Sequence, residues 1–477
     1  MATHKKTTAP DIVPNPTYPV GKNQLFYGDN LDVLRRKIPN ESVDLCYIDP
    51  PFNSKRNYFQ IYNNIGTDGG DKAQAQAFMD TWEWGDEAEA GFAYIVDVEN
   101  LNNSKFTPQT VALIRGLEHV LGHGDLFAYL VHMTLRIVEI HRVLKPTGSF
   151  YLHCDPTASH YLKLVCDSIF CADGNGGDFR NEIIWCYSIG GKSKQHFGRK
   201  HDVVFFYTKS KKYTFNKKGA SIARKMNTHM KTGIDEMGRA FQEKTDRKSG
   251  KVYRYYLDDG KIAEDYWLDI EKVALADDFW SDIETLNREA RERLGYPTQK
   301  PEALLERIIK TSSNEGDVVL DAYCGCGTTV AVAQRLKRQW IGIDITYQSI
   351  SLILKRLQEK YPDQWGIIEA NIKLDGVPRD FASAKALANR KDDKTRKEFE
   401  KWAVLTYSKN QARINDKKGA DGGIDGVAFF MVDANTNGKA VFQVKSGGAS
   451  RATIATLNSD RQREKAEFGI LITMDAP

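Results

Sequence analysis

Short apolar segments that alternate with helix-forming segments are the feature that most restricts the fold of this chain. The strand-like runs are residues 24–29, 42–48, 317–320 and 339–343, and helical patterns occupy residues 31–37, 328–337 and 347–360. This alternation predicts an α/β fold, with a parallel sheet covered by helices on both faces. Ligands of such sheets bind at the carboxyl ends of the strands. The polar residues that follow each strand are therefore the candidates for a site.

The composition indicates a globular protein of several domains. A chain of 477 residues allows about two to four domains, and its 41% hydrophobic and 27% charged residues exclude wholesale disorder. No apolar run approaches the ~20 residues of a membrane helix, and the polar start MATHKKTTAP lacks the apolar core of a signal peptide. Seven cysteines without a C-x-x-C pair argue against a disulfide framework. We therefore expect a cytoplasmic protein.

A glycine-rich turn, DAYCGCGTT at residues 321–329, follows one strand and opens the next helix. Gly325 and Gly327 permit a tight turn and a close approach of a ligand to the backbone. Val330 stands where the dinucleotide fingerprint has its third glycine, which favours a smaller nucleoside-type ligand over a pyrophosphate. Asp344 ends the next strand, where a carboxylate can accept hydrogen bonds from ribose hydroxyls.

Asp49, Pro50, Pro51 and Phe52 form the most specific motif, directly after the strand at residues 42–48. The two prolines fix φ and remove two backbone donors, which leaves carbonyl oxygens free as acceptors. A carboxylate beside a proline carbonyl suits an exocyclic amine, which presents two N–H donors. Accepting both hydrogens localises the nitrogen lone pair that the base ring otherwise delocalises. Phe52 supplies a flat face for an extruded base.

Together with Pro-Thr-Gln-Lys-Pro at residues 297–301, these motifs resemble those of the DNA amino-methyltransferases. Such enzymes transfer a methyl group from S-adenosylmethionine to adenine N6 or cytosine N4. The order of the motifs is similar to that of the circularly permuted β group, which includes the modification subunits of type III restriction systems. The resemblance covers residues 22–360 and implies a Rossmann-like S-adenosylmethionine-dependent methyltransferase fold.

The resemblance also implies roles for individual residues. The residues that hold the target base would be Asp49, Pro50, Pro51 and Phe52. The cofactor-binding residues would be Asp29, Thr298, Gln299, Lys300, Pro301, Asp321, Tyr323, Gly325, Gly327, Thr328 and Asp344. Within this set, Asp321 would line the methionine part of the cofactor, Asp344 would bind its ribose and Asp29 would lie near its adenine.

The target base is adenine or cytosine by the same resemblance. An initial Asp in the tetrad is more similar to the adenine enzymes, whereas Ser-Pro-Pro-Tyr is typical of cytosine-N4 enzymes. Both bases offer the same amine, so the chemistry does not separate adenine from cytosine. Cytosine N4, RNA and a protein amide therefore stay open as alternative acceptors. Carbon-5 cytosine methylation needs a cysteine nucleophile after proline, and the chain has no Pro-Cys pair. We expect a site-specific adenine-N6 methyltransferase of a restriction-modification system.

Basic charge is concentrated between residues 191 and 260, which hold 18 Lys and Arg against 7 Asp and Glu. Clustered cations neutralise phosphates, and interleaved rings such as Phe205, Tyr207 and Tyr256 can stack on bases or pack a scaffold. A solvated basic face is the alternative interpretation. Beside the motifs above, we expect residues 190–285 to be a target-recognition insert that binds double-stranded DNA.

The carboxyl-terminal segment carries a second candidate site. Glu400, Asp425 in a glycine-rich stretch, and Gln443-Val-Lys445 resemble the Mrr-like branch of the restriction-endonuclease fold. That resemblance implies Asp425 and Gln443 beside an Mg²⁺ ion, Lys445 stabilising developing charge, and Glu400 assisting. A glycine-rich hairpin with ordinary surface charges is the alternative. The fold usually continues beyond a strand such as residues 469–473, so the sequence leaves open whether this nuclease domain is complete or truncated, and active or inactive.

These features predict a methyltransferase domain over residues 1–375, a helical linker over residues 376–397 and an Mrr-like nuclease domain over residues 398–477. The competing interpretation is a metal-dependent DNA nuclease that keeps the methyltransferase fold as a scaffold. The sequence predicts DNA as the partner and no membrane. It leaves open a homodimer, a separate restriction or helicase subunit, and the recognised DNA sequence.

Overall fold

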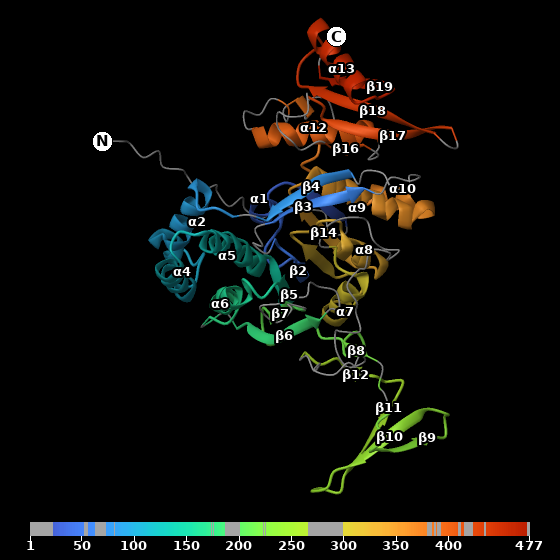
Figure 1. Ribbon diagram of the computed structural model, residues 1–477. Helices are drawn as coiled ribbons and strands as arrows, with labels where there is room; N and C mark the ends of the chain where they lie inside the picture. The colour runs from blue at the N-terminus through green and yellow to red at the C-terminus, as the bar shows by residue number, and fades with distance from the viewer. Residues whose placement is uncertain are drawn as a thin grey trace, which may run out of the picture.

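The computed structural model contains a larger α/β unit, built on an eight-stranded sheet, and a smaller one at the carboxyl end (Figure 1). It describes residues 22–51, 56–62, 73–80, 82–172, 174, 176–186, 201–222, 224, 226–265, 299–378, 384–385, 388, 393–408, 412–414, 423–433 and 436–474. Two of the predicted site residues, Phe52 and Thr298, lie outside these ranges.

The large sheet has the strand order β15–β1–β14–β13–β2–β5–β7–β6. Its strands are β15 (Ile372–Asp375), β1 (Asn23–Tyr27), β14 (Gln339–Asp344), β13 (Val318–Asp321), β2 (Val43–Ile48), β5 (Leu144–Cys154), β7 (His201–Thr208) and β6 (Asp178–Cys186). The six strands from β15 to β5 run parallel, whereas β7 is antiparallel to both of its neighbours, β5 and β6. The predicted α/β fold is confirmed. The predicted parallel arrangement holds for the strands from β15 to β5, and the sheet as a whole is mixed because β6 and β7 pair directly as consecutive strands, the usual antiparallel arrangement.

Both faces of this sheet are covered, as the sequence predicted. Cys46 and Ile48 of β2 belong to a core shared with α1, α5 and α6, whereas Leu45 and Tyr47 belong to a second core shared with α7, α8 and α9. The covering helices are α1 (Asn30–Lys37), α5 (Asp125–Val143), α6 (Ser159–Phe170), α7 (Glu302–Ser312), α8 (Thr328–Arg335) and α9 (Tyr347–Lys360). A strand that is apolar on both sides is what such a sheet requires.

The larger unit has further elements around this core. They are α2 (Asp86–Val96), α3 (Val98–Asn102), α4 (Pro108–Leu121), the short helices η2 (Pro362–Gln364) and α10 (Trp365–Ala370), and the antiparallel pair β3 (Arg56–Tyr62) and β4 (Ala73–Asp80). Among the described helices of the whole chain, none is long and apolar enough to cross a membrane.

A three-stranded antiparallel sheet projects from the body, and we call residues 231–256 the arm (Figure 1). Its strands are β9 (Lys231–Ile234), β10 (Ala240–Thr245) and β11 (Val252–Tyr256), and the short strands β8 (Ser221–Ile222) and β12 (Lys261–Ile262) pair at its base. The arm lies within the segment predicted to be the target-recognition insert. The insert is interrupted, since β7 within residues 190–285 belongs to the large sheet.

The basic charge of that segment precedes the arm. Residues 191–225 hold 11 Lys and Arg against 1 acid, whereas residues 226–260 hold 7 against 6. Arg239 of the arm pairs with Asp258 at 2.8 Å and with Asp259 at 2.7 Å. Its guanidinium also lies 4.0 Å from the centre of the Tyr256 ring. Of the interleaved rings, Phe205 and Tyr207 are buried in β7, where they pack the scaffold.

The carboxyl-terminal unit is a four-stranded sheet with two helices. Its elements are β16 (Arg413–Ile414), β17 (Gly426–Asp433), β18 (Thr436–Lys445), β19 (Phe468–Thr473), α12 (Asp393–Tyr407) and α13 (Arg451–Arg463). Helix α12 begins inside the segment predicted to be a linker and packs on α9 of the larger unit. At this contact the hydroxyl groups of Tyr347 and Thr406 lie 3.3 Å apart.

Candidate active site

The predicted catalytic carboxylate lies at the carboxyl end of β2. Asp49 and Pro51 are half-buried and Pro50 is buried. Strand β13 is the parallel neighbour of β2, with Leu320 opposite Cys46. The two strands therefore end side by side, which brings the Asp-Pro-Pro corner next to the glycine-rich turn that follows β13. The sequence predicted this juxtaposition from the positions of the two motifs after their strands.

Lys300 contacts the carboxylate of Asp49 directly. Its Nζ donates to Oδ2 of Asp49 at 2.7 Å, and only 8% of the Lys300 surface is exposed. The resemblance placed Lys300 on the wall of the cofactor pocket, but the structure places its ammonium group on the acid that would hold the target amine. Gln299 is half-buried beside it, and Pro301 precedes the first turn of α7. The ion pair offsets part of the desolvation cost of the buried Lys300 ammonium group.

Asp321 is the most deeply buried of the predicted acids, with 4% of its surface exposed. The N–H of Tyr323 donates to its Oδ1 at 3.0 Å, and the Thr329 side chain also hydrogen-bonds to it. Burial, together with the nearby charges of Asp49 and Asp344, raises the pKa of Asp321 to about 7. An acid with such a pKa near neutrality loses its proton readily when a cation binds beside it.

Two glycines shape the turn, as predicted. Gly325 and Gly327 have φ values of 47° and 74°, in the left-handed region. A Cβ on Gly327 would lie 2.5 Å from Cγ1 of Ile353, so packing as well as conformation requires glycine there. Helix α8 begins with the buried Thr328 immediately after the turn.

Asp344 holds the turn from the neighbouring strand β14. Its Oδ2 accepts the N–H of Gly325 at 2.9 Å, and its Oδ1 accepts the N–H and the hydroxyl of Thr346, each at 2.9 Å. Burial raises the pKa of Asp344 above its ordinary value. The Ser349 side chain also hydrogen-bonds to this carboxylate, so several protein partners orient Asp344 at the end of β14.

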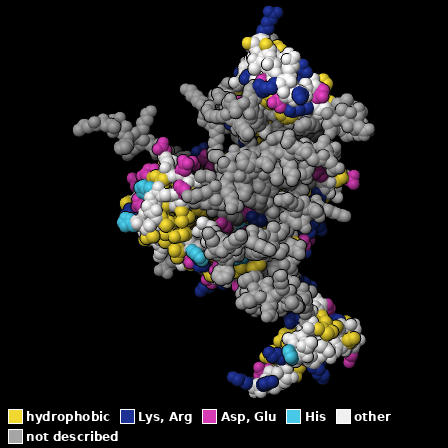
Figure 2. Space-filling view, in the orientation of Figure 1, with side chains coloured by type: hydrophobic (Ala, Val, Ile, Leu, Met, Phe, Trp, Pro, Cys, Tyr) yellow, Lys and Arg dark blue, Asp and Glu magenta, His cyan; other side chains and the backbone are white. Residues whose placement is uncertain are grey.

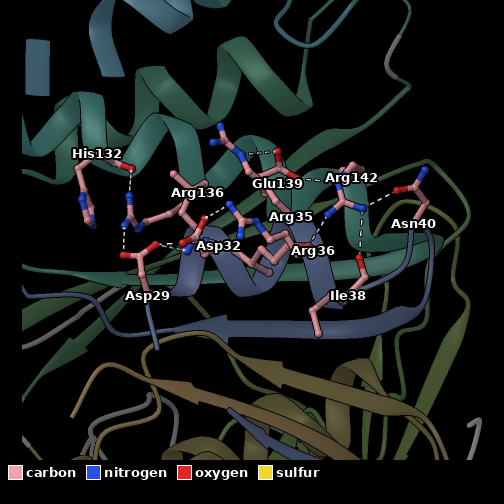
Figure 3. Close-up of polar contacts among 12 residues, drawn as sticks. Asp29, Asp32, Arg35, Arg36, Ile38, Asn40, His132, Arg136, Glu139 and Arg142 are labelled. Carbon is pink, nitrogen blue, oxygen red and sulfur yellow. Dashed lines mark hydrogen bonds and ion pairs between the residues drawn. The ribbon is translucent and has the colours of Figure 1, made fainter. Parts of the chain in front are cut away.

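Asp29 is tied to a buried arginine that the sequence analysis missed (Figure 3). Nη2 of Arg136, on α5, donates to Oδ2 of Asp29 at 2.8 Å, while Oδ1 of Asp29 caps α1 through the N–H of Leu31 at 2.9 Å. Nε of Arg136 donates to Oδ1 of Asn30 at 2.6 Å, and Nδ2 of Asn30 donates to the carbonyl of Ala322 at 2.9 Å. This chain connects α5, α1 and the glycine-rich turn. Its sequence signal is an arginine between apolar Leu135 and Ile137.

A second missed arginine joins the two walls of the site. Nη1 of Arg356, on α9, donates to the carbonyl of Cys326 at 3.2 Å and to Oγ1 of Thr328 at 3.3 Å. Its Nη2 donates to Oε1 of Glu302 at 2.9 Å, and Glu302 directly follows Pro301. Arg356 therefore fixes the 299–301 segment against the glycine-rich turn.

Two of the carboxyl-terminal candidate residues, Asp425 and Gln443, lie close together where β17 pairs with β18. Oδ2 of Asp425 accepts the N–H of Val444 at 2.7 Å, and Nε2 of Gln443 donates to the carbonyl of Gly423 at 3.1 Å. Burial raises the pKa of Asp425, although the charges of Lys445 and Lys397 oppose that shift. Glu400 lies half-buried on α12, which packs against β18.

One atom of this second site fits an oxygen-preferring cation. Gln443 is 97% buried, and its Oε1 has no hydrogen-bond partner in the described part of the chain. An amide oxygen and a carboxylate on neighbouring residues of the two strands are the donor types that Mg²⁺ binds. The described residues contain no group of three His, Cys, Asp or Glu side chains placed for a metal, so water or phosphate would complete the coordination.

Parallel neighbouring strands of an α/β sheet thus present the glycine-rich turn, Asp344 and the Asp49–Pro51 corner at one edge. Residues 43–355, more than half of the chain, match the N6/N4 family model described as DNA methylase, and the chain belongs to this family. Residues 392–476 match the Mrr catalytic family model described as restriction endonuclease. Both resemblances noted in the sequence are confirmed.

Individual relatives are similar over most of the larger unit. The DNA adenine methyltransferase YhdJ of Escherichia coli K12 is 28% identical over 335 residues, 70% of this chain and 82% of that protein. The type II methyltransferase M.HinfI of Haemophilus influenzae is 26% identical over 367 residues, 75% of this chain and 74% of that protein. The solved PvuII DNA methyltransferase (cytosine-N4-specific) is 15% identical, with a TM-score of 0.40, and covers 75% of this chain and 96% of its own.

Proposed function

We propose that this chain transfers a methyl group from S-adenosylmethionine to the N6 amine of adenine at specific sites in double-stranded DNA. The observation that carries the proposal is the pairing of β2 with β13, which brings the Asp49–Pro51 corner next to the Asp321–Thr329 turn. The printed name of YhdJ, an adenine methyltransferase, and the initial Asp of the tetrad support adenine as the base.

The residues around the turn fit a cationic nucleoside cofactor. When bound, S-adenosylmethionine supplies a methyl group activated by a positively charged sulfonium. Asp321 would ionise beside that positive charge, since its pKa of about 7 makes the proton easy to lose. Asp344 would accept a ribose hydroxyl, and Asp29, held by Arg136, would lie toward the adenine. Gly325 and Gly327 allow the backbone to approach the ligand closely.

The corner after β2 would hold the acceptor amine. Lys300 occupies Oδ2 of Asp49, so we assign Oδ1 of Asp49 and the carbonyl of Pro50 to the two hydrogens of the amine. Holding both hydrogens directs the nitrogen lone pair toward the methyl group. The nitrogen loses one proton in the reaction, and Asp49 is the acceptor within reach of it.

A methyl-transfer assay with radiolabelled cofactor and DNA from a methylation-deficient host tests this proposal. The intact chain is expected to label DNA, and Asp49→Ala is expected to abolish labelling. Asp363→Ala, at an exposed position in η2, is the matched control and should leave the rate unchanged. No label in DNA with the intact chain, or equal labelling by Asp49→Ala, would contradict the proposal.

We also infer a second activity for the carboxyl-terminal unit, metal-dependent cleavage of DNA, because of the orphan Oε1 of Gln443. Asp425 and Gln443 would hold Mg²⁺, and Lys445, exposed at the end of β18, would stabilise charge on a phosphate. Cleavage of plasmid DNA that requires Mg²⁺ and disappears with Lys445→Ala would support this inference. Mg²⁺-independent cleavage, or no cleavage, would count against it.

The remaining expectations concern partners and place. A cytoplasmic enzyme that acts on cellular DNA fits the proposed reaction. A homodimer and a separate restriction or helicase subunit stay predictions, which gel filtration and co-purification would check. The domain boundaries at residues 375 and 398 likewise stay a proposal. Helix α12 crosses the second of them.

A further inference from the structure

A buried hydrogen-bonded chain that the proposed reaction does not use lies beside the catalytic corner. Its members are Tyr47 on β2, His153 on β5 and Asp202 on β7. Oη of Tyr47 and Nδ1 of His153 are 2.9 Å apart, and Nε2 of His153 and Oδ2 of Asp202 are 3.0 Å apart. The exposed fractions are 2% for Tyr47 and 0% for His153.

The three residues come from three adjacent strands at the edge of the sheet that carries Asp49. Tyr47 lies two residues before Asp49, and β5 pairs with β2 with Tyr151 opposite Tyr47. On its other side β5 pairs with β7, with His153 opposite Val204, so Asp202 lies two residues beyond this pair. The hydrogen bonds among Tyr47, His153 and Asp202 therefore cross-link the carboxyl ends of β2 and β5 to the start of β7.

The hydroxyl of Tyr47 and the carboxylate of Asp202 lie on opposite nitrogens of the His153 ring, so the imidazole connects the two side chains. Burial and the nearby charges of Asp49, Asp321 and Asp202 raise the pKa of Tyr47, so its hydroxyl keeps its proton. The Trp185 ring packs edge-on against His153, with centroids 5.5 Å apart, and restrains the imidazole.

We propose that Tyr47, His153 and Asp202 are positioning residues for methyl transfer, which together fix the end of β2 and so place the Asp49 carboxylate and the Pro50 carbonyl around the target amine. This inference rests on the proposed function of the site. Placement matters because a shift of about 1 Å in a reacting group can cost about 100-fold in rate. Lys300 constrains only one oxygen of Asp49, whereas the cross-link constrains the backbone from which Asp49 extends.

The sheet contains a matched control for the Tyr47 hydroxyl. Tyr151 lies opposite Tyr47 on β5, is also 2% exposed, and belongs to the same core. Its hydroxyl lies 2.8 Å from Oγ of Ser312 on α7, away from the His153 chain. Tyr47→Phe and Tyr151→Phe each remove one buried, hydrogen-bonded hydroxyl and keep the ring. They should therefore lower the thermal midpoint by similar amounts.

The test compares single-turnover rates of methyl transfer to DNA by the full chain, with enzyme in excess. We expect Tyr47→Phe and Asp202→Asn each to slow transfer by about tenfold, and Tyr151→Phe to stay within about twofold of the wild type. The Kd of S-adenosylmethionine, measured by equilibrium dialysis, should change by less than about twofold in all three variants. The Tyr47→Phe/Asp202→Asn double variant should be no slower than the slower single variant, because each substitution interrupts the same series of hydrogen bonds.

Each outcome decides the matter. Equal rates for Tyr47→Phe and wild type, or an equal loss in Tyr151→Phe, would overturn the positioning role and leave the proposed function intact. A decrease of about 100-fold in the single-turnover rate of the double variant would show that Tyr47 and Asp202 act independently. It would overturn the proposal that the three residues act together. A wild-type chain that transfers no methyl group to DNA would overturn the proposed function, and this inference with it.

Discussion

The two candidate sites of this chain differ in whether their acceptor oxygens have hydrogen-bond partners. At the edge of the large sheet, Asp49, Asp321 and Asp344 each accept hydrogen bonds from protein groups. In the carboxyl-terminal unit, Asp425 has such a partner, but Oε1 of Gln443 is buried without one among the described residues. In the space-filling view, the carboxyl-terminal unit at the top presents Lys and Arg side chains on its surface (Figure 2).

The difference indicates how each site gains its chemistry. A site for an organic cofactor and a base must hold its acceptors in place before the ligands arrive, since misplacement is costly. A site that gains an ion can leave one oxygen unpaired until the ion completes its coordination.

Replacing Asp49 with alanine and replacing Asp425 with alanine should each affect only one of the two activities. Asp49→Ala should lower kcat for methyl transfer by about 10²–10⁴-fold, since it removes the acceptor of the amine hydrogens. Asp425→Ala should leave methyl transfer unchanged and abolish Mg²⁺-dependent cleavage. Parallel methylation and plasmid-cleavage assays on both variants check this. Loss of both activities in either variant would show that the two sites are not independent.

Cofactor affinity should depend on pH through Asp321. Its pKa is raised to about 7, so the cofactor-free protein holds a proton there below neutrality and releases it when a cation binds. Affinity for S-adenosylmethionine should therefore rise by up to about tenfold per pH unit between about pH 5 and 7, and level off above. Asp321→Asn should bind more weakly and lose the slope.

The same shift affects folding with a definite sign. A carboxyl group whose pKa is higher in the folded state than in the unfolded state stabilises the protein at low pH and loses that contribution as pH rises toward 7. Cofactor-free Asp321→Asn should therefore lack this part of the decline. Calorimetric titration for binding and thermal melts between pH 5 and 8 measure both effects. A flat wild-type affinity profile would contradict the assignment of Asp321.

Magnesium should stabilise the carboxyl-terminal unit. A cation that completes the coordination around Gln443 and Asp425 would bind only the folded chain and add about 1–3 kcal/mol at saturating concentrations. Scanning calorimetry with and without Mg²⁺ should show a rise of a few degrees in the transition of this unit. Asp425→Asn should remove the rise, and Asp363→Asn should keep it. An equal rise in both variants would mean non-specific ion effects.

Arg239 of the arm should contribute little to the salt dependence of DNA binding. Arg239 is already paired with Asp258 and Asp259, so Arg239→Ala should leave the slope of log K against log salt unchanged. Lys217 and Lys218, exposed in the basic segment before the arm, should lower the slope by about 1 each when replaced by Ala. Filter binding at several salt concentrations measures this. A reduced slope with Arg239→Ala would place phosphate contacts on the arm.

The sequence carried the fold and the main chemistry of the first site because both depend on local patterns. Apolar runs gave the strands, and the rule that parallel strands present ligands at their carboxyl ends placed Asp49, Asp321 and Asp344 at one edge. The left-handed φ of Gly327 likewise follows from its place in a tight turn. These features require no knowledge of distant partners.

What could not be predicted depends on side chains far apart in the sequence. Lys300 and Asp49 are 251 residues apart, and Arg136 reaches Asp29 across 107. In the sequence, Arg136 and Arg356 cannot be distinguished from other basic residues beside the apolar face of a helix. Only the packing of the folded protein shows that they are buried. The reversal of β7 and the ion pairs of Arg239 likewise arise from tertiary contacts.

The most direct test of the central claim is the chemical identity of the methylated atom. DNA is treated with the chain and a cofactor that carries a deuterated methyl group, and its nucleosides are separated and weighed by mass spectrometry. We predict deuterated N6-methyladenine, absent with Asp49→Ala. N4-methylcytosine would keep the amine-holding corner and change only the base. Deuterium at carbon 5 of cytosine, or none in DNA, would contradict the account.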